Sequence, residues 1–212
     1  MRVAVDLEDV LVDCNSRFIE RLNFFIEKRF PGSGLEFQRS DISGWAYDGV
    51  REPFSELMGW ETDQVRKFMY GHGDWKGYIP ITEEIWREET GSIPWIDENL
   101  EKNIQLLREK VKTENGQLHL VTARRRCDNS IKQKLGEKHL ERYFDKIVIE
   151  SEKHELDYDF YIDDNPGLYP KLESGKVQLV RIQPWNRDKQ VQTPHRKIGS
   201  ISESVEVIQD LD

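Results

Sequence analysis

The chain has 212 residues, of which 37% are hydrophobic and 33% are charged, enough to build one large domain or two small ones around a buried core. Its formal net charge of −9 argues against nonspecific binding to nucleic acid polymers or anionic membranes, because both depend on a surplus of Lys and Arg. The two cysteines, Cys14 and Cys127, are far apart and have no metal-ligand spacing. We therefore expect a cytoplasmic protein without a disulfide framework. We also expect no leader and no membrane span.

The first half of the chain predicts one strand followed by helices. Val3, Ala4 and Val5 form a continuous apolar run and predict a buried strand over residues 2–7. Apolar residues at helical spacing then predict a helix over 13–30, which ends at the sequence FPGSG. Residues 35–96 contain short amphipathic pieces and five of the six tryptophans, and predict a compact helical insert.

The second half alternates between helical and strand patterns. A helix is predicted over 96–116, and the later elements are a strand over 117–123, a helix over 127–144, strands over 145–151 and 159–164, a short helix or turn over 165–174, a strand over 177–183 and a closing helix over 200–211. Strands separated by helical segments indicate a parallel sheet covered on both faces. We predict a Rossmann-like three-layer α/β core formed by residues 1–13 and 97–212, with a helical domain inserted over 14–96.

Polar side chains follow the predicted strands at the points where the strands end. They are Asp6 and Glu8 after the first strand, Thr122 after the second, Lys153 just beyond the third, and Asp163 with Asp164 after the fourth. In parallel sheets the ligand lies at the carboxyl ends of the strands. Carboxylates are suitable ligands for Mg²⁺, and a lysine and a hydroxyl are suitable for phosphoryl oxygens, so this edge predicts a magnesium and phosphate site.

These residues carry a resemblance to a known family. The ordered set VAVDLEDVL, LVTAR, a lysine ten residues before an acidic pair, and FYIDDNP resembles the four motifs of the haloacid dehalogenase-like (HAD) phosphohydrolase superfamily. The segment IQPWNR at 182–187 is similar to one that follows the last core strand in the 5'(3')-deoxyribonucleotidase branch. The motifs span most of the chain, and the helical insert lies where that branch places a cap domain. The resemblance implies a Mg²⁺-dependent phosphomonoesterase whose cap closes over the substrate.

The resemblance also implies a role for each motif residue. Asp6 would be the nucleophile that forms an aspartyl-phosphate, and Glu8 would be the acid/base residue, with its main-chain carbonyl facing the metal. Asp163 and Asp164 would complete the Mg²⁺ ligands. The phosphate oxygens would be held by Thr122, the amide of Ala123, Lys153 and Arg124.

One position departs from the family pattern. Phosphatases of the superfamily have Asp followed by Gly where this chain has Glu8 and Asp9. The extra methylene moves the carboxylate by about 1 to 1.5 Å, and a shift of that size can cost about 100-fold in rate. We therefore expect Glu8→Asp to raise turnover or at least not to abolish it.

The resemblance favours a nucleoside monophosphate as substrate, and hence a 5'-nucleotidase. Four aromatic residues of the insert are candidates for stacking on a base, although for most of them the pattern favours a place in the insert's own core: Phe18, Trp45, Trp60 and Trp75. Two alternatives stay open, a phosphatase for another small phosphorylated metabolite and a catalytically weak module that binds a nucleotide or a partner. A response-regulator receiver is rejected, because its acidic pair follows the first strand and its lysine comes last.

Overall fold

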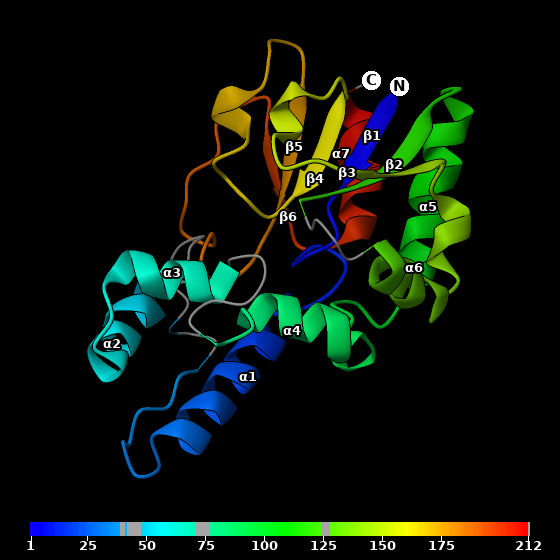
Figure 1. The fold of residues 1–212 in the computed structure, drawn as a ribbon. Helices are drawn as coiled ribbons and strands as arrows, with labels where there is room; N and C mark the ends of the chain where they lie inside the picture. The colour runs from blue at the N-terminus through cyan, green and yellow to red at the C-terminus, as the bar shows by residue number, and fades with distance from the viewer. Residues whose placement is uncertain (39–40, 42–47, 71–76, 124–127, 212) are drawn as a thin grey trace. The chain divides into compact units, whose positions relative to one another are not determined.

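The computed structural model describes most of the chain, namely residues 1–38, 41, 48–70, 77–123 and 128–211 (Figure 1). The chain divides into two compact units. The sheet unit contains Met1–Asp13 and Trp95–Asp212, and the helical unit contains Cys14–Pro94.

The sheet unit is built on six parallel strands in the order β3-β2-β1-β4-β5-β6 (Figure 1). Their bounds are β1 (Arg2–Val5), β2 (Gln117–Thr122), β3 (Lys146–Ile149), β4 (Phe160–Asp163), β5 (Val177–Arg181) and β6 (Arg196–Ile198). This arrangement confirms the predicted parallel α/β core. The sequence pattern does not predict β6, because its three residues are too few to show a periodicity.

Helices and the connections on either side of β4 pack against this sheet. The helical segments of the unit are α5 (Leu100–Thr113), α6 (Asp128–Gly136), α7 (Ile201–Leu211) and the 3-10 turns η3 (Leu140–Tyr143), η4 (Lys153–Glu155) and η5 (Tyr169–Lys171). Helices α5 and α7 contact each other, α5 contacts β2 and α7 contacts β6. In one buried cluster, Tyr158 and Leu168 pack with Ala4, Val121 and Tyr161 of the strands. Residues from the connections before and after β4 therefore pack on side chains of the sheet.

The predicted helix over 127–144 is shorter in the structure. Helix α6 ends at Gly136, and His139 adopts a left-handed conformation with φ 52° before η3 begins. Glycine is a poor helix former, which accounts for the break at this point. By contrast α5 ends as its sequence suggests, because Asn115 is left-handed and the Gly116 amide donates to the Val111 carbonyl at 2.8 Å.

The helical unit consists of short helices around an aromatic core. Its elements are α1 (Cys14–Arg29), α2 (Asp48–Met58), α3 (Thr62–Tyr70), α4 (Ile81–Glu88) and the 3-10 turn η2 (Thr90–Ser92). Phe68 lies at the centre, with ring centroids 5.3 Å from Phe25, 5.5 Å from Trp60, 5.8 Å from Tyr78 and 6.1 Å from Phe54. Such contacts supply the apolar area that a small unit needs. None of the helices in the described residues is both long and apolar enough to span a membrane.

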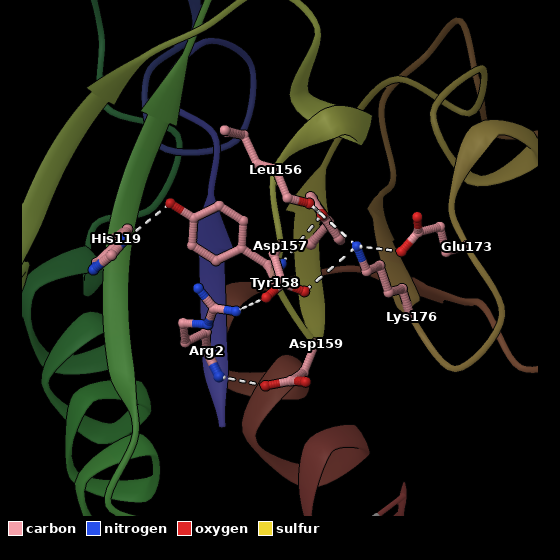
Figure 2. Close-up of polar contacts among 9 residues, drawn as sticks. Arg2, His119, Leu156, Asp157, Tyr158, Asp159, Glu173 and Lys176 are labelled. Carbon is pink, nitrogen blue, oxygen red and sulfur yellow. Dashed lines mark hydrogen bonds and ion pairs between the residues drawn. The ribbon is translucent and has the colours of Figure 1, made fainter.

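We call the end of the sheet at which the strands begin its amino edge, and the opposite end its carboxyl edge. Figure 2 shows the polar contacts at the amino edge among β1, β2 and the segments that precede β4 and β5. The Arg2 amide donates to Asp159 Oδ2 at 2.5 Å, and the Arg2 guanidinium forms an ion pair with Asp157. His119 Nδ1 lies 2.8 Å from the Tyr158 hydroxyl. These contacts join the starts of neighbouring strands through groups of complementary charge or polarity.

Candidate active site

Asp6 is the first residue after β1, at the carboxyl edge of the sheet. Its amide donates to the Ile162 carbonyl of β4 at 2.9 Å, so the ladder between β1 and β4 continues one residue beyond the strand. Its Oδ1 accepts a hydrogen bond of 2.8 Å from the Leu7 amide. The side chain is buried, with 8% of the residue exposed. Main chain and side chain of Asp6 are both held in place by the local fold.

The structure brings Asp6 together with the acidic pair that ends β4. The carboxylates of Asp6, Asp163 and Asp164 each offer an oxygen atom, and these oxygens all lie within 4.8 Å of one another. The cause is topological, because β1 and β4 are neighbours and both carry their acids at the same end. Asp163 Oδ1 also accepts the Asn165 amide at 2.9 Å, which orients its carboxylate.

Lys153 lies between two of these carboxylates. Its Nζ is 2.6 Å from Asp6 Oδ2 and 2.7 Å from Asp163 Oδ2. Burial alone would lower the pKa of the Lys153 ammonium, but the carboxylates of Asp163 and Asp6 outweigh that effect and raise it. Lys153 is therefore a fixed positive charge at the site.

Ionisation of all the acids would place more negative charge at the site than Lys153 can balance. Burial raises the pKa of Asp6 to about 7, with Asp163 and Glu8 acting in the same direction and Lys153 in the opposite one. Burial also raises the pKa of Asp164 well above its ordinary value, and its neighbour Asp9 is the next cause. Buried carboxylates that repel one another in this way are stabilised by a cation. Three hard oxygen donors so close together suit a divalent ion such as Mg²⁺, which prefers carboxylate and water ligands.

The comparisons with known proteins identify the fold. No family model matches the chain, and no curated protein sequence does either. A solved structure, a predicted phosphatase from Clostridium acetobutylicum, matches with a TM-score of 0.60 and 16% identity over 99% of this chain and 98% of its own. A HAD family hydrolase from Deinococcus radiodurans with bound phosphate and sodium matches with a TM-score of 0.59 and 15% identity over 99% and 95%. The chain has the haloacid dehalogenase-like fold.

A further HAD structure concerns the metal. The HAD hydrolase YfnB from Bacillus subtilis, bound to magnesium, matches with a TM-score of 0.54 and 14% identity over 98% of this chain and 97% of its own. At this level of identity the similarity concerns the fold. The chemistry has to be inferred from the side chains of this chain.

The HAD fold places the remaining motif residues on neighbouring elements. Thr122 ends β2, which pairs with β1, and is fully buried, while Ala123 follows it and is exposed. Glu8 lies in the loop after β1 and is half-buried. Because Glu8 contributes to the raised pKa of Asp6, the two carboxylates are electrostatic neighbours. Arg124 lies outside the described residues.

Asp9 occupies a strained position in this HAD loop. Its φ of 58° is left-handed, a conformation that favours glycine, and glycine is the residue that the family pattern has at this position. The Asp9 amide donates to the Val12 carbonyl at 2.7 Å and closes the loop. The departure from the family pattern therefore preserves the backbone shape and adds a carboxylate near Asp164.

The base-stacking candidates belong to the helical unit. Phe18 is buried in α1, with 1% exposed, and Trp60 contacts Phe54 and Phe68 of the aromatic core. Trp45 and Trp75 lie outside the described residues. The burial of Phe18 and the ring contacts of the half-buried Trp60 fit a role in the packing of the unit, and a role in base recognition stays a prediction.

Sequence reasoning gives no role to three buried amide side chains near the acids. They are Gln178 in β5, and Gln183 and Asn186 in the segment that follows it. Gln183 donates to the Asp9 carbonyl and Asn186 to the Asp164 carbonyl. The resemblance of IQPWNR at 182–187 points to this segment but predicts no contact for Gln183 or Asn186.

Proposed function

We propose that the protein is a Mg²⁺-dependent phosphomonoesterase that acts through an aspartyl-phosphate on Asp6. The observation that carries the proposal is the grouping of Asp6, Asp163 and Asp164 within 4.8 Å, with Lys153 between Asp6 and Asp163. The phosphate bound to one HAD structure and the magnesium bound to another support it. Similarity of fold alone does not indicate which reaction is catalysed, whereas this combination of acids and a lysine suits phosphoryl transfer.

In this proposal Asp6, Asp163 and Asp164 hold the cation. When bound, the cation supplies positive charge that favours the ionised form of Asp6 and neutralises phosphoryl oxygens. The hydrogen bond from the Leu7 amide to Oδ1 and the contact of Lys153 with Oδ2 fix the plane of the Asp6 carboxylate. A carboxylate held in this way is oriented for attack, which is the main requirement for phosphoryl transfer.

The proposed reaction has two steps. An Asp6 oxygen attacks phosphorus, the bond to the ester oxygen breaks, and Glu8 gives its proton to that departing oxygen. Glu8 then accepts a proton from a water molecule that attacks the same phosphorus, which releases phosphate and restores Asp6. Lys153, the Thr122 hydroxyl and the Ala123 amide are proposed to bind the phosphate oxygens.

The substrate that we propose is a nucleoside monophosphate, which would make the enzyme a 5'-nucleotidase. The support is the resemblance of the segment at 182–187 and the presence of a separate helical unit over Cys14–Pro94, which is proposed to act as the cap. A panel of phosphate esters decides between a nucleotide and another small metabolite. Hydrolysis of nucleoside monophosphates at least about tenfold faster than that of sugar phosphates is the expected result.

The reaction itself is tested with p-nitrophenyl phosphate. We expect turnover with Mg²⁺, none with a chelator, and a loss of at least about 10³-fold in Asp6→Asn, because that variant removes the nucleophile. Asp159→Asn makes the same chemical change at the amino edge, on an exposed residue, and is expected to keep full turnover. If the wild type binds a nucleotide but hydrolyses no ester, the chain is the catalytically weak binding module instead.

A further inference from the structure

Three buried side-chain amides come from one stretch of chain beside the acidic site. Gln178 and Asn186 are fully buried, and Gln183 is 5% exposed. All three donate hydrogen bonds to main-chain carbonyls in other segments. We call Gln178, Gln183 and Asn186 the amide brace.

Gln183 and Asn186 connect the loop after β1, which follows Asp6, with the main chain of Asp164, which follows β4. Gln183 Nε2 donates to the Asp9 carbonyl, in the loop after β1, at 2.5 Å. Asn186 Nδ2 donates to the Asp164 carbonyl, after β4, at 2.7 Å. The Asn186 side chain also accepts the Gln183 amide at 2.8 Å, so the two residues hold each other in register.

Two further bonds attach the brace to the sheet itself. Asn186 Nδ2 donates a second time, to the Arg181 carbonyl at the end of β5, at 2.8 Å. Gln178 Nε2 donates to the Asn165 carbonyl at 2.8 Å, one residue beyond the acidic pair. The loops after β1 and β4 are therefore both tied to β5 and the segment behind it.

Such ties matter because the acids repel one another. Asp6 and Asp163 are fixed by the strand ladders, whereas Asp164 and the loop that carries Asp9 lie beyond the ladders and can move relative to them. An amide group can restrain a loop by bonding its main chain, and it adds no charge to a crowded anionic site. A lysine would pair with the acids and a carboxylate would add to the repulsion. A buried amide also favours the one arrangement in which its donors are satisfied.

We infer that Gln183 and Asn186 are positioning residues, which hold the loops of Asp9 and Asp164 so that the carboxylates of Asp6, Asp163 and Asp164 are ready for a divalent cation before it arrives. This inference rests on the proposed function only in that it takes the acidic group to bind Mg²⁺. Partners that orient metal ligands in this way affect metal affinity by about 10- to 100-fold. Loss of the brace should therefore weaken the binding of Mg²⁺ itself.

The test is a calorimetric titration of metal-free protein with MgCl₂. Gln183→Met removes one donor and keeps the size of the side chain, and Asn186→Ala removes the donors to Asp164 and Arg181. We expect each to raise the dissociation constant for Mg²⁺ at least about tenfold. Val111→Ala creates a defect in α5, in the buried core, and is expected to leave that constant within about twofold. Thermal melting confirms that each variant is folded at the titration temperature.

Each outcome bears on the inference separately from the proposed reaction. Unchanged Mg²⁺ affinity in both brace variants would overturn it, as would an equal loss in Val111→Ala, which would show that affinity simply follows stability. A wild type that does not bind Mg²⁺ would overturn the brace and the metal site together. A wild type that binds Mg²⁺, loses affinity in the brace variants and hydrolyses no phosphate ester would support the brace and refute the hydrolase alone.

Discussion

The two edges of the sheet differ in how they place charge. At the carboxyl edge Asp6, Asp163 and Asp164 are all buried and lie within 4.8 Å of one another, although like charges in a site of low polarity repel. Lys153 contacts two of them and reduces this repulsion. The fold holds these groups together at a cost in stability.

At the amino edge the charges are complementary. Lys176, whose side chain is 13% exposed, lies 3.0 Å from Glu173 (Figure 2). Arg2 and Asp157 form an ion pair with 44% and 73% of their side chains exposed. Exposed pairs of this kind contribute about 0 to 1 kcal/mol. The amino edge therefore pairs opposite charges, whereas the carboxyl edge gathers carboxylates and raises the pKa values of Asp6 and Asp164, an arrangement that agrees with the cation site proposed above.

The largest difference between the two edges is expected in turnover, when the length of the Glu8 side chain is changed. Glu8→Asp shortens the proposed acid/base residue to the length that the family pattern has, and we expect turnover of p-nitrophenyl phosphate to rise by up to about 100-fold at saturating Mg²⁺. The matched change at the amino edge is Asp157→Glu, which alters an exposed carboxylate by one methylene and is expected to change turnover less than about twofold. Loss of all activity in Glu8→Asp, in an otherwise active enzyme, would show that the role given to Glu8 is wrong.

A smaller effect, on the free energy of unfolding, is expected from Asp164→Asn. This substitution should stabilise the metal-free protein, whereas most substitutions destabilise a protein. It removes a carboxylate whose pKa is raised by burial and by Asp9, so we expect the metal-free protein to gain about 1 to 2 kcal/mol in free energy of unfolding. The stabilisation that Mg²⁺ gives to the wild type should disappear, because a ligand is lost. Urea denaturation with a chelator and with Mg²⁺ measures both.

The same change at the amino edge is the control for this prediction. Asp159→Asn weakens the acceptor of the Arg2 amide and should cost about 0.5 kcal/mol, with or without Mg²⁺. If Asp164→Asn also destabilised the metal-free protein, repulsion between the carboxylates would not explain how the two edges differ in stability.

The grouping of the acids could be predicted because they lie at strand ends, whereas Lys153, in η4, is indicated by the motif resemblance. Apolar runs such as Val3 to Val5 locate a strand, and parallel strands bring their last residues to one edge. Asp6 and Asp163 therefore follow from the sequence once their strands are located. The fold class follows in the same way, from the alternation of strands with helical segments.

The brace and the smaller elements could not be predicted in this manner. The partners of Gln183 and Asn186 are main-chain carbonyls, which every residue has, so no pattern of side chains marks them. They are defined only by how the segment after β5 folds back on the loops. Likewise β6 is too short for a period, and the end of α6 depends on local conformations at Gly136 and His139.

The smallest expected effect is the pH dependence of stability that His119 gives to the amino edge. Burial lowers the pKa of His119, with Lys146 and Arg2 acting in the same direction and Asp145 in the opposite one. The unfolded chain therefore binds a proton to this histidine more readily than the folded protein does. Its contribution to stability is present above about pH 6.5 and is lost as the pH falls from there through the lower pKa of the folded state.

Because His119 is partly exposed, solvent screening keeps this loss to about 0.5 kcal/mol or less. His119→Gln should remove that part of the pH dependence in urea midpoints measured between pH 5 and 8. Tyr158→Phe deletes the hydroxyl that contacts His119 and leaves burial, the first cause of the shift, largely in place, so the pH dependence should persist. A flat profile in Tyr158→Phe would instead identify the hydroxyl contact as the source, and the amino edge would then respond to pH through one hydrogen bond.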